Sequence, residues 1–102
     1  MSASDDIWIL GIHMTKFGKH YDQDLVDLGA EAIMGALADA GVSMADIGVM
    51  AAGNLMGRGG IAQQLQKQVG QTGIPAYNVS NACATGATAL RTAIMAVKAG
   101  EV

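Results

Sequence analysis

Cys83 is the only cysteine of this 102-residue chain, and its surroundings favour a reactive thiol. An apolar run that ends at Val79 leads through residues 80–82 into a stretch of small residues that predicts a helix. Unpaired backbone N–H groups and the positive end of the helix dipole favour the charged form of a sulfur at a helix N-terminus. Small neighbours such as Ala84 and Gly86 leave room for a substrate carbonyl. These features make Cys83 a candidate nucleophile.

The alternative is a structural cysteine, because free cysteine is among the most buried residue types. Residue chemistry alone leaves both interpretations open. No charged residue occurs between Lys67 and Arg91. We therefore expect the strand, the turn and the first part of the helix around Cys83 to be buried.

The two histidines and three of the carboxylates in the first half of the chain also invite an acid–base interpretation. We interpret His13 and His20 as solvated or structural. Asp24, Asp27 and Glu31 lie away from the apolar stripe of a predicted helix. This position is typical of a solvated face and argues against a paired-carboxylate site.

Two glycine-bearing loops invite comparison with nucleotide-binding loops, but their spacing argues against it. Six residues separate Gly11 from Gly18, where a P-loop needs four, and no Ser or Thr follows Lys19. The loop at residues 54–60, which surrounds Arg58, lacks the Gly-x-Gly-x-x-Gly spacing of a dinucleotide site. Neither loop is predicted to bind a nucleotide.

The elements that must position Cys83 alternate between strand and helix. Residues 24–40 have the i, i+3, i+4 apolar spacing of an amphipathic helix, which Gly41 ends. The predicted elements, in chain order, are a strand at 7–12, a helix at 24–40, a strand at 47–52, a helix at 61–69, a strand at 75–79 and a helix at 83–99. This βαβαβα order indicates an α/β fold with a mostly parallel sheet and right-handed crossovers.

The composition is that of one folded domain spanning residues 1–102, with 51% hydrophobic and 15% charged residues. A net charge of -3 with six Lys and Arg argues against a nucleic-acid partner or an anionic membrane surface. A single cysteine permits no internal disulfide, which fits a reducing compartment. The acidic, polar first residues lack the features of a secretory signal, and no run approaches about 20 consecutive apolar residues. We expect a cytoplasmic protein with no metal and no bound cofactor.

The run from Asn81 to Ala87 resembles the nucleophile motif of the thiolase superfamily, in which Asn-x-Cys-Ala-(Ser/Thr)-Gly opens a central helix. Residues 11–18 resemble the first strand and loop of the sterol-carrier-protein-type thiolases. Residues 53–55 resemble the end of their second strand, and residues 99–101 resemble the end of their nucleophile helix. The resemblance extends over residues 7–102, so it predicts the N-terminal part of a thiolase.

This resemblance implies a thiolase-type acyl-CoA acyltransferase with Cys83 as its nucleophile. Cys83 would take the acyl group from an acyl thioester, and the group would then pass to coenzyme A or to the carbanion of a second acyl-CoA. Coenzyme A is then a substrate and not a bound cofactor. The backbone N–H of Cys83 would help to hold the oxyanion. The resemblance also implies a homodimer through the strand from Pro75 to Val79.

The chain resembles only the first βαβαβα portion of the αβαβα layered thiolase fold. The family's histidine that activates the nucleophile, its second cysteine and most of its coenzyme A surface have no counterpart in this sequence. We therefore expect an N-terminal fragment, or a chain that a partner completes, and not a polypeptide that is competent alone.

Three alternatives to the acyltransferase remain. The run from Ala82 to Ala87 is also similar to the cysteine motif of β-ketoacyl carrier-protein synthases, although residues 14–18 and 53–55 favour a thiolase. Other relatives of the sterol-carrier-protein type are lipid-transfer-protein-like retro-aldolases that act with a zinc-binding partner protein. The last alternative is a non-catalytic thiolase-like subunit used for assembly.

Overall fold

Helices and strands follow one another in the order helix, strand, helix, strand, helix. The computed structural model describes residues 6–57 and 59–102, so residues 1–5 and Arg58 lie outside the described residues. The elements are α1 (Leu25–Ala40), a 3-10 helix (Met44–Asp46), β1 (Met50–Gly53), α2 (Ile61–Val69), β2 (Ala76–Val79) and α3 (Thr85–Lys98).

The longest helix, α1, is capped at both ends, by two aspartates at its start and by the predicted Gly41 at its end. The Asp27 backbone N–H donates to Asp24 Oδ1 at 2.8 Å, and the Asp24 N–H donates to Asp27 Oδ2 at 3.1 Å, which forms a capping box. Gly41 ends the helix with φ 72°, a left-handed conformation that glycine adopts at low cost. The predicted helix and its glycine stop are confirmed, and the two aspartates serve as a cap as well as a solvated face.

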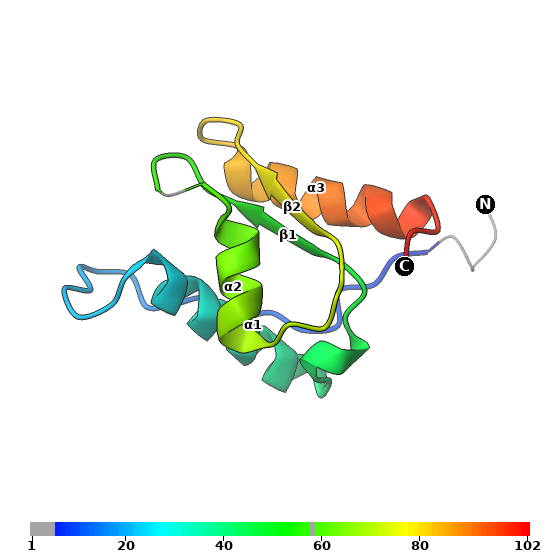
Figure 1. Ribbon diagram of the computed structural model, residues 1–102, viewed down its shortest axis with the longest axis horizontal. Coiled ribbons are helices and arrows are strands. Elements are labelled where there is room, and N and C mark those ends of the chain that lie inside the picture. Colours follow the sequence, from blue (N-terminus) through cyan, green and yellow to red (C-terminus); the bar gives the residue numbers. More distant parts are fainter. Residues whose placement is uncertain (1–5, 58) are drawn as a thin grey trace.

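The strands β1 and β2 run parallel, with Met50 opposite Ala76 and Gly53 opposite Val79. Successive side chains of β2 point to opposite faces of this sheet. Tyr77 bonds to Glu101, just beyond α3, whereas Asn78 bonds to the start of α2. The helices α2 and α3 therefore cover opposite faces of the sheet, and α1 packs against α2 (Figure 1).

The buried core lies between α1, α2 and β1 and is built from aliphatic and methionine side chains. Its members are Val26, Leu37, Met44, Met50, Ile61, Ala62 and Leu65. Ala62 and Leu65 of α2 and Val26 and Leu37 of α1 belong to the apolar stripes read from the sequence or lie beside them. This core holds α1 and α2 as one layer over the sheet.

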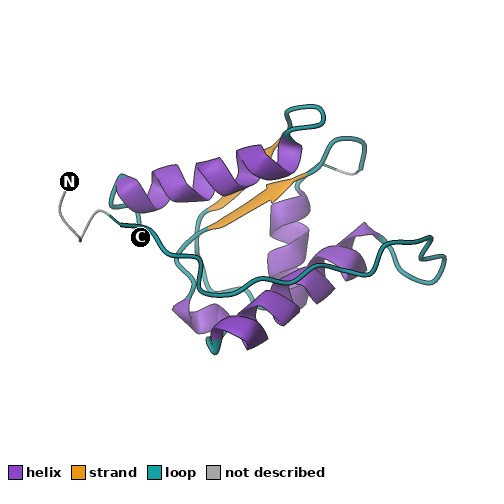
Figure 2. Ribbon diagram, turned by 180° about the vertical axis from the view of Figure 1, so that it is seen from behind, coloured by secondary structure: helices purple, strands orange, loops and turns teal. Residues whose placement is uncertain are grey.

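The first predicted strand, at residues 7–12, is not a strand in the described structure. This segment is extended, runs along α1 (Figure 2) and leaves large apolar side chains exposed, such as Trp8 at 75% and Ile12 at 72%. Its Ile12 N–H donates to Asp39 Oδ2 of α1 at 2.9 Å. Because that backbone group bonds to a helix side chain and not to the free edge of β1, the run stays outside the sheet.

Other boundaries also differ from the predicted ones. The second strand begins at Met50 because the 3-10 helix at Met44–Asp46 occupies the chain up to Ile47. The third begins at Ala76, after a proline that cannot donate to a ladder. The last helix begins at Thr85, two residues after Cys83, because the tight turn before it bonds to α3 through Thr85.

The expected burial of the strand, the turn and the first part of the helix is wrong except at Thr85. No residue of β2 is fully buried, residues 80–84 are exposed, and most of α3 is exposed or half-buried. The absence of charged residues does not by itself bury a segment, because burial also needs another element packed against it. Among the described residues, α3 has the sheet on one face and no element packed on the other.

Candidate functional site

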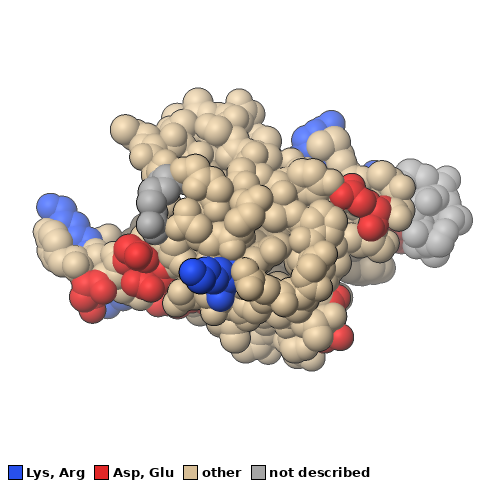
Figure 3. Space-filling view, viewed as in Figure 1, with Lys and Arg blue, Asp and Glu red and all other residues tan. Residues whose placement is uncertain are grey.

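The turn that carries Cys83 lies at the carboxyl end of β2, beside the loop that follows β1. Parallel strands bring their following loops to the same edge of a sheet, and Figures 1 and 2 show these two loops together there. Cys83 is a free, exposed thiol in this turn. Apart from Arg58, which lies outside the described residues, the loops at this edge carry no Lys, Arg, Asp or Glu (Figure 3).

Backbone hydrogen bonds and the Thr85 side chain stabilise the tight turn between β2 and α3. The Ala84 N–H donates to the Asn81 carbonyl at 2.9 Å, and the Thr85 N–H donates to the Ala82 carbonyl at 3.3 Å. Thr85 Oγ1 donates to the Ala82 carbonyl at 2.7 Å and accepts the Asn81 N–H at 2.8 Å. The hydroxyl thus joins two backbone groups that lie just before Cys83.

Ala82, the residue before the cysteine, has φ 46° and is the one described non-glycine residue with positive φ. A left-handed conformation costs an L-amino acid roughly 1 to 2 kcal/mol, so other contacts must hold it. The hydrogen bonds of the turn stabilise this conformation of Ala82. This backbone geometry sets the direction in which the Cys83 side chain leaves the chain.

The side chain of Asn81 ties the turn to the second turn of α3. Asn81 Nδ2 donates to Thr88 Oγ1 at 2.9 Å. Thr85 and Thr88 stand one helical turn apart, so they lie on the same face of α3. The turn is therefore held to the helix by its backbone and by two side-chain contacts.

Gly53, at the end of β1, lets the first turn of α3 approach the sheet closely. A Cβ at this position would lie 2.6 Å from Thr85 Cγ2 and 2.9 Å from the Thr85 carbonyl oxygen. Only a residue without a side chain fits such a contact. Gly53 therefore sets the distance between the sheet and the helix that follows Cys83.

The loop after β1 begins with a side-chain hydrogen bond of its own. Asn54 Oδ1 accepts the Gly57 N–H at 2.9 Å, and the loop exposes the apolar side chains of Leu55 and Met56. Arg58, in the same loop, lies outside the described residues.

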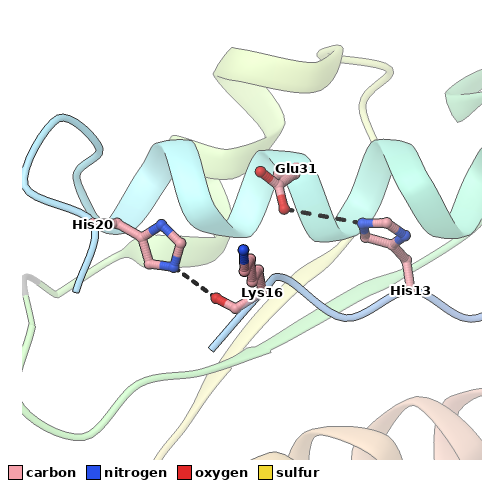
Figure 4. A network of polar contacts seen from close by, with 4 residues as sticks. All are labelled: His13, Lys16, His20 and Glu31. Carbon is pink, nitrogen blue, oxygen red and sulfur yellow. Dashed lines mark hydrogen bonds and ion pairs between the residues drawn. The ribbon is translucent and has the colours of Figure 1, made fainter. Parts of the chain in front are cut away.

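The two histidines lie elsewhere, along α1 (Figure 4). His13 Nε2 is 4.0 Å from Glu31 Oε2, and His20 Nε2 donates to the Lys16 carbonyl at 2.6 Å. These contacts link the N-terminal segment to α1 and close its loop. The structure gives both rings a structural partner and does not bring them to Cys83.

Sequence reasoning placed Cys83 at the first residue of the helix, whereas it lies in the turn two residues before α3, and the residues that hold this turn were missed. Thr85 and Gly53 were read only as parts of motifs, and Asn78 only as part of a dimer strand. The Asn78 side chain instead accepts the Ala62 N–H at 2.8 Å and donates to Gln63 Oε1 at 2.8 Å. A threonine two residues after the cysteine is a signal that could have been read, because Ser and Thr hydroxyls bond to nearby backbone groups.

Within residues 6–57 and 59–102, no three His, Cys, Asp or Glu side chains come together as metal ligands do. No helix in the same ranges has the length and apolar character that crossing a membrane would take.

Comparison with known families gives one match that spans almost the whole chain. Residues 7–102 match the family described as "Thiolase, N-terminal domain". The acetyl-CoA acetyltransferase of Methanothermobacter thermautotrophicus is 40% identical over 100 residues, which covers 93% of this chain and 26% of that protein. Sterol carrier protein 2 of Gallus gallus is 40% identical over 87 residues, with 82% of this chain and 16% of that protein covered. The chain thus spans about a quarter or less of these relatives.

Solved structures show the same fold at lower sequence identity. The 3-oxoacyl-(acyl carrier protein) synthase III of Xanthomonas oryzae superposes with a TM-score of 0.70 at 23% identity, covering 79% of this chain and 25% of that one. The corresponding synthase of Aquifex aeolicus gives a TM-score of 0.65 at 24% identity, covering 78% and 27%. At this identity the likeness concerns the fold alone.

Proposed function

Because the chain belongs to the thiolase family, whose N-terminal domain it matches over residues 7–102, we propose that it is the nucleophile-bearing part of an acyl-CoA acyltransferase. Cys83 is the nucleophile in this proposal. The observation that carries it is the exposed, sole cysteine in a held turn, inside a stretch that matches this family. The polypeptide is the N-terminal portion of a longer protein or is completed by a partner chain.

The proposed reaction has two transfers. The Cys83 thiolate attacks the carbonyl carbon of an acyl thioester, the bond from that carbon to the coenzyme A sulfur breaks, and coenzyme A leaves as thiolate. The acyl group then passes from Cys83 to coenzyme A or to the carbanion of a second acyl-CoA, which restores the thiolate. Coenzyme A is a substrate here, and the base that takes the first proton belongs to the remainder of the protein.

Three features of the turn support this role. Cys83 is open to a substrate, and its neighbours Ala82, Ala84 and Gly86 add little bulk. A Cβ on Gly86 would meet no atom within 4 Å, so the space beside the turn is free within the described structure. The backbone N–H of Cys83, in the turn before α3, is suited to hold the oxyanion of the first transfer.

Acylation of Cys83 by acetyl-CoA in the intact native protein tests the proposal. We expect an acetyl thioester on the Cys83 peptide by mass spectrometry, release of one coenzyme A per site, and protection of Cys83 from iodoacetamide. Cys83→Ala should abolish the label. An unlabelled Cys83 that alkylates as fast as free cysteine would instead favour the assembly subunit. A labelled Cys83 without thiolysis would favour a ketosynthase or a retro-aldolase with its zinc-binding partner.

We also propose a homodimer through the edge of β2, in a cytoplasmic protein. The Pro75 carbonyl accepts the Met50 N–H, and the Val79 carbonyl accepts the Asn54 N–H. In a parallel ladder the backbone groups of the alternate residues Ala76 and Asn78 therefore point away from β1. Such an edge can pair with a second copy. Ala76→Pro removes one edge donor and should shift the protein toward monomer in sedimentation velocity, whereas Ala76→Ser should not. An unchanged dimer in the folded proline variant argues against this edge.

A further inference from the structure

Thr85 makes contacts that differ from those of the other threonines of α3. The residue is 9% exposed, and its hydroxyl bonds to the backbone of both Asn81 and Ala82. The hydroxyl of Thr92 donates only to the Thr88 carbonyl of its own helix, at 2.8 Å. Thr92 therefore makes an ordinary bond inside the helix, whereas Thr85 reaches out of the helix to the turn that carries the cysteine.

The Thr85 side chain is constrained from two directions. Its hydroxyl lies between the two backbone groups of the turn, and its methyl Cγ2 faces the bare backbone of Gly53 on β1. Threonine is β-branched, so its χ1 has few alternatives once both substituents are placed. The sheet therefore orients Thr85, and Thr85 orients the turn.

The turn needs such an anchor because Ala82 lies in the left-handed region at φ 46°. The carbonyl that Thr85 holds belongs to Ala82, and this carbonyl begins the peptide unit that leads into Cys83. Rotation of that peptide unit would swing the Cys83 side chain. A small displacement of a reacting atom can cost about 100-fold in rate.

We infer that Thr85 is a positioning residue for acyl transfer: its hydroxyl holds the Asn81–Ala82 backbone so that Cys83 points at the thioester carbonyl. This inference rests on the proposed function of Cys83. Thr85 touches neither the acyl group nor coenzyme A in this role. It acts through the backbone, so its loss should slow acylation and leave substrate affinity nearly unchanged.

The test compares Thr85→Val, Thr85→Ser and Thr92→Val in the intact native protein. Single-turnover acetylation of Cys83 by acetyl-CoA is measured over a range of acetyl-CoA concentrations. For Thr85→Val we expect a maximal rate about 10- to 100-fold lower, with a half-saturating concentration close to the wild type. Thr85→Ser keeps the hydroxyl and should restore most of the rate, and Thr92→Val should match the wild type.

The outcomes separate this inference from the proposed function. If wild-type Cys83 is acetylated and Thr85→Val is equally fast, or if Thr85→Ser is as slow as Thr85→Val, the inference is overturned and the proposed function stands. If wild-type Cys83 takes no acetyl group, both are overturned. Should Thr85→Val fail to fold, Ala82→Gly is added, because glycine adopts a left-handed φ without the alanine cost. That double variant should still acetylate slowly, and a wild-type rate in it would overturn the inference.

Discussion

At the scale of single residues, Asn78 shows how a strand side chain can cap a helix that has no cap of its own. Gly60 precedes α2 and has no side chain to offer. Asn78 Oδ1 instead accepts the Ala62 N–H from the neighbouring strand, and Asn78 Nδ2 holds Gln63. A nonlocal contact thus replaces the usual local one.

Removal of the Asn78 side chain is expected to lower the stability of the protein. Asn78→Ala should lower the free energy of unfolding by about 1 kcal/mol, the usual worth of an N-cap, in urea titrations of the intact protein. Asn78→Asp keeps the oxygen acceptor and should lose less. Gln68→Ala, on the exposed side of α2, is the control and should change little. Equal stabilities of Asn78→Ala and wild type would show that the cap contributes nothing.

Tyr77 supplies a prediction about pH. Its hydroxyl donates to Glu101, and this bond, with partial desolvation and the Glu101 charge, raises the pKa of Tyr77 above its usual 10.0. A raised pKa in the folded protein means that the stabilisation is complete below about pH 10 and is lost as pH rises through the higher pKa. Stability should therefore fall above about pH 10.

Two variants check this pH dependence. The stability of Tyr77→Phe should fall less than that of the wild type as the pH rises, because the variant has no phenol to ionise. The urea midpoint between about pH 9 and about pH 11 measures this difference. Glu101→Gln removes the charge but keeps an acceptor, so it should move the Tyr77 phenolate absorbance to lower pH. A phenolate titration that is the same in Glu101→Gln and wild type would exclude this pairing in solution.

At the scale of elements, the fit between β1 and α3 depends on one glycine. Gly53→Ala places a methyl group 2.6 Å from Thr85 Cγ2, so the first turn of α3 must move. We expect a loss of about 1 to 3 kcal/mol, as for other overpacked sites. Gly86→Ala, in open space one residue into the helix, should instead gain about 0.5 to 1 kcal/mol from helix propensity. Thermal and urea denaturation measure both, and a neutral Gly53→Ala would refute the close contact.

At the scale of the whole molecule, the segment at residues 7–12 is attached to α1 through a close backbone approach. A Cβ on Gly11 would lie 2.6 Å from the Ala40 backbone nitrogen, and Ile12 bonds to Asp39 nearby. Gly35 of α1 likewise lies directly under the His13 ring. Gly11 in the segment and Gly35 in α1 therefore both permit this close approach.

This attachment predicts that Gly11→Ala releases the segment from α1. Amide exchange at Ile12 should become faster, and proteolysis within residues 7–12 should increase, because opening of a local segment exposes its backbone. Gly59→Ala, which meets no atom within 4 Å, is the matched control. Unchanged exchange at Ile12 in Gly11→Ala would show that another contact holds the segment.

Much of the fold could be predicted because local patterns dominate in it. The helices at residues 24–40 and 61–69 have strong 3.6-residue periodicity, and the structure confirms them with a shift of one residue or none. The α/β class and the thiolase resemblance are also confirmed. The segment at residues 7–12 was predicted wrongly because an apolar run fits a strand by pattern, whereas a strand also needs a neighbour whose backbone it can pair with.

The sequence by itself determined that one cysteine stands between an apolar run and a small-residue helix, in a motif that resembles a nucleophile site. Side-chain types and spacing suffice for that, because both are local. Only the tertiary structure decided that Cys83 precedes α3 by two residues, that Thr85 holds the turn, and that Gly53 allows α3 to pack closely against the sheet. Each of these depends on backbone groups that meet through folding, and a linear pattern of residues does not specify which of them come into contact.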